Sequence, residues 1–152
     1  MNMSAITLIL STICTVNAMQ LILNLPTGSE LHQAIQTGNI NEALRILTNL
    51  ESKTNELLAR NLLLQVNQNN QTALHLAIER GHTKCAIAIC KLAIRHHCFK
   101  ALYNAQDLDN KKAIDCALTK KNFVVKVVLT SFLAFTKRNE SHYYEQSSTS
   151  HL

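Results

Sequence analysis

Residues 70–82, which read NQTALHLAIERGH, constrain the fold of this chain more than any other stretch. Thr72 is a residue type that caps the N-terminus of a helix. Gly81 supplies the left-handed conformation that ends a helix and turns the chain back. Between them the apolar residues recur at the i, i+3 and i+4 spacing of one helical stripe, as Leu74, Ala77 and Ile78. The stretch therefore predicts a short amphipathic helix that begins at Ala73.

This stretch resembles the first half of an ankyrin repeat, whose family pattern is G-x-T-P-L-H-x-A-x-x-x-G-H. The resemblance implies an all-α fold, an ankyrin-repeat solenoid of helix-turn-helix units. It also implies that His75, which follows the leucine of the pattern, joins neighbouring repeats through hydrogen bonds.

The motif recurs in weaker form on both sides. Residues 29–39 (SELHQAIQTGN) share its Leu, His, Ala, Ile and Gly, and residues 112–122 (KAIDCALTKKN) match it more loosely. A second apolar helix is predicted after each copy. We therefore expect about three repeats, and the resemblance covers residues 29–133.

Two polar segments, residues 66–70 and 104–110, are similar to the V-N-x-x-D-x-x-G finger that links ankyrin repeats. Asn70 and Asn110 occupy its glycine position, and Asn is the next-best residue for a positive φ. The motifs begin at residues 29, 72 and 112, so they lie 43 and then 40 residues apart, against about 33 in the family. The surplus falls at residues 50–64 and 92–102, where we expect longer outer helices or an extra turn in the loops.

The two ends of the chain differ from the repeats. No charged residue precedes Glu30, and the apolar run at residues 5–16 is followed by Val16-Asn17-Ala18, which fits a cleavage site. We expect residues 1–18 to be a signal peptide or an apolar N-terminal segment. The alternatives are a membrane anchor over residues 5–25 and a helix that caps the repeat stack. The repeat domain would then span residues 19–135, and the polar residues 136–152 predict a disordered tail.

The formal charge of +5 arises in the C-terminal third, where eight Lys and Arg between Lys100 and Arg138 oppose three Asp. Such a patch attracts phosphate, but no aromatic residues interleave with its lysines to stack on bases. Nucleic acid is therefore not the expected partner. The lysines would face solvent, an acidic protein or a membrane surface.

The sequence predicts neither an enzyme nor a cofactor. His96 and His97 are adjacent, so on a helix they point about 100° apart and rarely share one metal ion. Asp115 and Cys116 could be drawn as a catalytic pair, but the resemblance places them at the histidine position and at an apolar position of the repeat. Four cysteines fit no zinc spacing and are expected to be buried thiols, or disulfides if the domain is exported: Cys85, Cys90, Cys98 and Cys116.

The resemblance implies noncatalytic protein–protein binding through the finger tips and the concave helix face. Leu108, an apolar finger-tip residue, would anchor the partner or pack on its neighbour. We expect a monomeric module, exported or host-directed as an effector. The alternatives are an IκB-like inhibitor of a transcription factor and a membrane-anchored scaffold. The positions left free by stacking are Gln36, Thr37, Gln68, Asn69, Gln71, Glu79, Arg80, Gln106, Leu108, Asp109, Lys111, Thr119 and Lys120.

Overall fold

The computed structural model describes residues 28–53 and 56–148, and within these ranges the chain forms helices and no strands. The all-α class expected from the sequence is confirmed for this part of the chain. The helices are α2 (Gly28–Gln36), α3 (Ile40–Lys53), α4 (Glu56–Leu64), α5 (Ala73–Glu79), α6 (Thr83–Arg95), α7 (Phe99–Asn104), α8 (Ala113–Thr119) and α9 (Phe123–Ser148).

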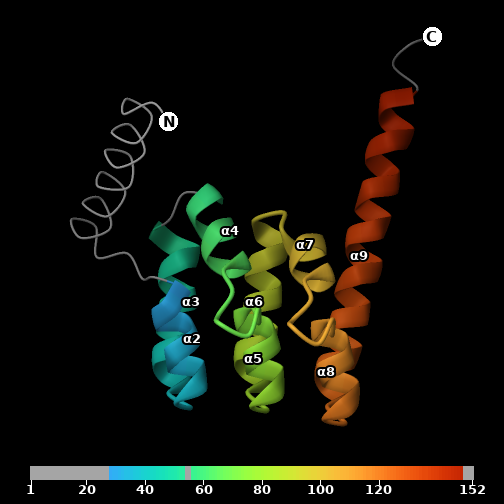
Figure 1. Ribbon diagram of the computed structural model, residues 1–152. Helices are drawn as coiled ribbons and strands as arrows, with labels where there is room; N and C mark the ends of the chain where they lie inside the picture. The colour runs from blue at the N-terminus through green and yellow to red at the C-terminus, as the bar shows by residue number, and fades with distance from the viewer. Residues whose placement is uncertain (1–27, 54–55, 149–152) are drawn as a thin grey trace, which may run out of the picture.

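Three helix-turn-helix pairs, α2–α3, α5–α6 and α8–α9, lie side by side in chain order (Figure 1). The first helices form one layer, because α5 packs against both α2 and α8. The second helices form another layer, because α6 packs against both α3 and α9. Each pair therefore buries its apolar surface mainly against its neighbours, as in a linear repeat array.

The turn inside each pair has the same geometry. In the middle pair Gly81 has φ +75°, its N–H donates to the Ile78 carbonyl at 3.1 Å, and the next N–H donates to the Ala77 carbonyl at 2.8 Å. These two bonds satisfy carbonyl groups that the end of the helix leaves unpaired. Gly38 and Lys121 have φ of +74° and +53° at the corresponding positions. Lys121 therefore adopts the left-handed conformation in which a side chain is strained.

The surplus residues between motifs form two further short helices, α4 and α7. The sequence predicted longer outer helices or an extra turn in the loops, and the structure instead adds a separate helix after each of α3 and α6. Both helices contribute apolar side chains to the core, namely Leu62 and Leu63 from α4 and Phe99 and Leu102 from α7. The Phe99 ring meets the Phe132 ring of α9 edge to face, with centroids 6.0 Å apart, which is a favourable aromatic geometry.

The last helix extends further than expected. α9 continues past residue 135 to Ser148, where the polar composition predicted a disordered tail over residues 136–152. No Gly or Pro follows Asn122 in the sequence, so nothing in the local chemistry ends the helix early.

The expected signal peptide at residues 1–18 and the alternative anchor at residues 5–25 lie outside the described residues. In the described part of the chain, none of the helices has the length and apolar character that crossing a membrane requires.

Candidate functional site

Two loops of eight residues each, residues 65–72 and 105–112, stand between successive helix pairs (Figure 1). In the first loop the Asn67 side-chain oxygen accepts hydrogen bonds from the N–H groups of Asn69 at 2.9 Å and Gln71 at 3.0 Å. Asn70 follows with φ +56°, and Val66 pairs with Thr72 in an antiparallel bridge. An Asn side chain that accepts hydrogen bonds from the backbone of its own loop stabilises a tight turn locally, without contacts to the core.

The second loop repeats this geometry with a carboxylate in place of the amide. Asp107 Oδ1 accepts from the N–H groups of Asp109 and Lys111, both at 2.9 Å. Asn110 has φ +58°. The positive φ predicted for Asn70 and Asn110 is therefore confirmed, because their short polar side chains tolerate this region better than most residues.

The two loops are bonded to each other. The Leu108 N–H donates to the Asn69 carbonyl at 3.2 Å, and the Asn70 side-chain amide donates to the Gln106 carbonyl at 2.7 Å. The loop tips therefore keep a fixed relative position.

Two buried histidines connect the first and the middle pair, each to the loop that follows it. His75 Nε2 lies 3.2 Å from the Lys111 carbonyl oxygen, and its Nδ1 lies 2.8 Å from the Thr72 hydroxyl. His32 Nε2 lies 3.1 Å from the Gln71 carbonyl oxygen. The hydrogen bond predicted for His75 toward the following segment is present, and it joins the middle helix pair to the loop before α8. Burial lowers the pKa of His75 below its ordinary value, against smaller opposing effects from the Lys111 carbonyl and Asp107, so the neutral ring is favoured.

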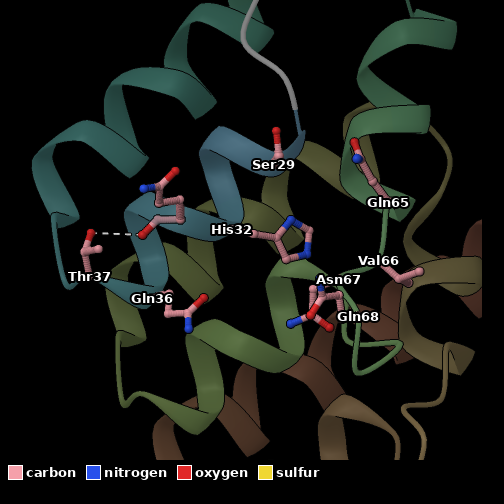
Figure 2. Close-up of a pocket in the computed structure, with 9 residues that line it drawn as sticks. Ser29, His32, Gln36, Thr37, Gln65, Val66, Asn67 and Gln68 are labelled. Atoms are coloured by element: carbon pink, nitrogen blue, oxygen red, sulfur yellow. Dashed lines mark hydrogen bonds between the residues drawn. The ribbon is translucent and has the colours of Figure 1, made fainter.

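A groove of about 520 Å³ lies between α2 and the first loop (Figure 2). The predicted residues Gln36, Thr37 and Gln68 line it, and none of its lining residues is an Asp, Glu, Lys or Arg. The structure adds Gln33 and Gln65, which the sequence interpretation missed. In the motif alignment Gln33 takes the position of Leu76, which is buried. A polar residue at this apolar position was the signal from which Gln33 could have been predicted to line a surface groove.

A second, smaller hollow of about 140 Å³ lies between α5, the second loop and α8. Lys111 Nζ lies 3.2 Å from Asp109 Oδ2, and this hydrogen bond raises the pKa of Lys111. The Gln71 amide donates to Glu79 at 2.9 Å. The hollow mixes both signs of charge, so the basic C-terminal third does not present a purely cationic site here. Six predicted residues meet around it: Gln71, Glu79, Asp109, Lys111, Thr119 and Lys120. Asp107 also lines the hollow and was missed.

The remaining predicted residues are exposed. Leu108 has 68 % of its surface exposed at the loop tip, so it does not pack away beneath its neighbour. Asn69, Arg80 and Gln106 are exposed as well. We call the surface formed by the two loops and the helices α2, α5 and α8 the loop face.

Asp115 and the cysteines have structural surroundings. Asp115 Oδ2 accepts the Lys112 N–H at 2.9 Å, which caps the start of α8. Cys85, Cys90 and Cys98 are buried and Cys116 is half-buried, all as free thiols. Burial raises the pKa of each, that of Cys90 to about 12, so the reactive thiolate is disfavoured. Among the described residues, no three His, Cys, Asp or Glu side chains gather to hold a metal ion.

A comparison of the chain with protein-family models and with curated proteins finds no match in either set.

Proposed function

We propose that the chain is an ankyrin-repeat domain of three repeats. Three features of the described residues support this proposal together. They are the helix pairs in two layers, the Asx-fixed loops between pairs, and the buried histidines that bond the following loop.

We propose further that the domain binds another protein, without catalysis, through the loop face. Glutamine and asparagine side chains gather there, and each amide both donates and accepts hydrogen bonds as a peptide group does. The groove beside α2 is lined by four glutamines and no formally charged residue, which suits the backbone of a polypeptide segment better than a phosphate or a small ion.

The exposure of Leu108 carries this proposal. A leucine on a loop tip that is bonded to its neighbouring loop is ordered, apolar and accessible. Buried apolar anchors at the centre of an interface supply much of its binding energy. The partner would place Leu108 in an apolar pocket and meet the mixed charges of Asp109 and Lys111 beside it.

The test is quantitative affinity capture of partners from the natural source with immobilised full-length protein. Compared with the wild type, Leu108→Ala combined with Lys111→Ala should reduce recovery of specific partners by about tenfold, a typical loss for a hot-spot truncation. Leu57→Ala is the matched control, because Leu57 is a similarly exposed leucine on α4, outside the loop face. Equal recovery of every partner by the double variant would exclude this surface.

Export and a role as a host-directed effector remain a separate part of the proposal, because they depend on residues 1–18. We expect the exported protein to begin at Met19, and its N-terminal residue and intact mass in each cell fraction test this. A full-length chain in the exported fraction would contradict cleavage.

A further inference from the structure

The last helix pair, α8–α9, lies at one end of the row of pairs (Figure 1), and it carries exposed apolar side chains. Phe123 and Val127 have 69 % and 61 % of their surfaces exposed. The exposed positions of α9 recur at helical spacing, so they lie along one side of the helix. Between the large apolar side chains, this side carries the small uncharged residues Thr130, Ser131 and Ala134, which are also exposed. We call this surface the end face, and its large apolar residues are Leu118, Phe123, Val124, Val127 and Phe135.

The end face corresponds to the surface that each earlier pair presents to the next one. The motif alignment equates Leu118, Phe123 and Val127 with residues 40 positions earlier in the middle pair. Of those residues, Ile78 is fully buried and Ile87 is half-buried, and the Thr83 hydroxyl contacts the third pair by accepting a hydrogen bond from the Asn122 amide at 3.3 Å. The last pair thus keeps an apolar stacking surface, although the ends of repeat arrays are ordinarily polar.

Among the described residues, the opposite end of the stack carries a charged pair. Ala88 of α6 lines a groove with Leu44 and Leu47 of α3, and its equivalent in the first pair is Arg45. Arg45 forms a two-pronged ion pair with Glu42, at 2.8 and 2.6 Å. Stacking an end face of one chain onto this end of another would bury these charges beneath apolar side chains, which is costly. Head-to-tail addition of copies is therefore disfavoured.

We propose that the end face binds the same face of a second copy, giving a twofold dimer with the α9 helices antiparallel. A twofold axis near Thr130 and Ser131 sets Val127 of each chain opposite Ala134 of the other and Val124 opposite Lys137. It also brings Phe135 within one helical turn of Val127 and Val124 of the other chain. Small side chains at the crossing let the helices approach closely, and a twofold interface requires this kind of self-complementarity. This arrangement differs from the monomer expected from the sequence.

The size of the end face fits a reversible dimer. Its exposed apolar side chains amount to on the order of 500 Å², the size of patches that mark interaction sites, and smaller than the roughly 800 Å² per partner of a standard interface. The end face shares only α8 with the loop face, through Leu118, so a dimer would still present two copies of the loop tips.

The experiment is sedimentation of the full-length chain over a concentration series between about 1 and 100 μM, a range suited to interfaces of this size. We expect the mass to rise from 17.0 kDa toward twice that value. Val127→Glu places a charge opposite its symmetry mate's apolar surface and should leave a monomer over the whole series. Because Val127 is exposed, this variant should fold, and its helical circular dichroism checks that it does. Leu57→Glu is the control, since Leu57 is similarly exposed on α4, outside both faces, and it should dimerise like the wild type.

A second measurement fixes the geometry. Ser131→Cys, close to the proposed axis, should form a disulfide-linked dimer on mild oxidation, in excess of any formed by the wild-type cysteines, whereas Leu108→Cys should not. A wild-type monomer throughout the series, growth into larger polymers, or a Val127→Glu dimer would each overturn the proposal. If the loop face alone binds the partner, Val127→Glu should capture as much partner as the wild type. The capture experiment and the sedimentation experiment can therefore contradict the two proposals separately.

Discussion

Single residues join the helix pairs, and His75 shows how one of them responds to pH. Its Nδ1 accepts from the Thr72 N–H at 3.4 Å and lies beside the Thr72 hydroxyl, so a proton on Nδ1 would remove an acceptor from a buried site. The pKa of His75 is lowered by burial, and the unfolded chain therefore binds a proton more readily than the folded one.

We predict that the free energy of unfolding falls as the pH drops below 7 through the ordinary histidine pKa near 6.5, because the unfolded chain takes up the proton first. Urea titrations at a series of pH values measure this. His75→Gln should flatten the dependence, and His97→Asn, at an exposed histidine, should retain it. Identical pH profiles for His75→Gln and the wild type would contradict this role.

Lys121 carries strain that glycine would remove. Its φ of +53° matches that of a helix-ending glycine, and Lys121→Gly should raise the free energy of unfolding by about 1 kcal/mol. Gly81→Ala should lower it by a similar amount, because an added Cβ meets nothing within 4 Å and only the backbone conformation opposes it. Thermal and urea unfolding of both variants provide the measurement, and a destabilised Lys121→Gly would show that the lysine side chain has a compensating contact.

At the scale of the element, α7 shows that a short insertion can be part of the core. Phe99 is almost fully buried and contacts Phe132 of α9 and Tyr103 of its own helix. Phe99→Ala should therefore cost about 3–5 kcal/mol of unfolding free energy through lost burial and an unfilled cavity. Leu108→Ala, at an exposed position, should cost little. A loss below about 1 kcal/mol for Phe99→Ala would mean that α7 is dispensable.

The sequence predicted the elements whose ends are defined by local residue types. Thr72, Gly81 and the stripe between them define α5 locally, and the Asn residues with positive φ define the loops, so both could be inferred without tertiary information. α7 was missed because six residues with two buried side chains show no clear periodicity. Most positions of the loop face followed from the resemblance to ankyrin repeats, which implies that stacking uses the other positions. Gln33, Gln65 and Asp107 were missed because their place in the hollows depends on how α2 and the loops are packed together.

At the scale of the whole molecule, the described pairs are unequal in burial. All but the last residue of α5 are buried, whereas only Ala113 and Ala117 of α8 are. Amide hydrogen exchange should therefore be slowest in α5 and α6 and faster in α8, because local opening is easiest where few apolar contacts hold an element. Exchange followed by mass spectrometry measures this order at low protein concentration. Uniform protection across the three pairs would indicate that they open only together.

The bonded loops have a consequence for kinetics. Asn67 and Asp107 fix their own turns, and the Leu108 N–H holds the two tips together, so these residues are ordered before any partner arrives. A preorganised surface loses little conformational entropy on association. Variants of the loop tips should therefore change the dissociation rate of a partner far more than its association rate.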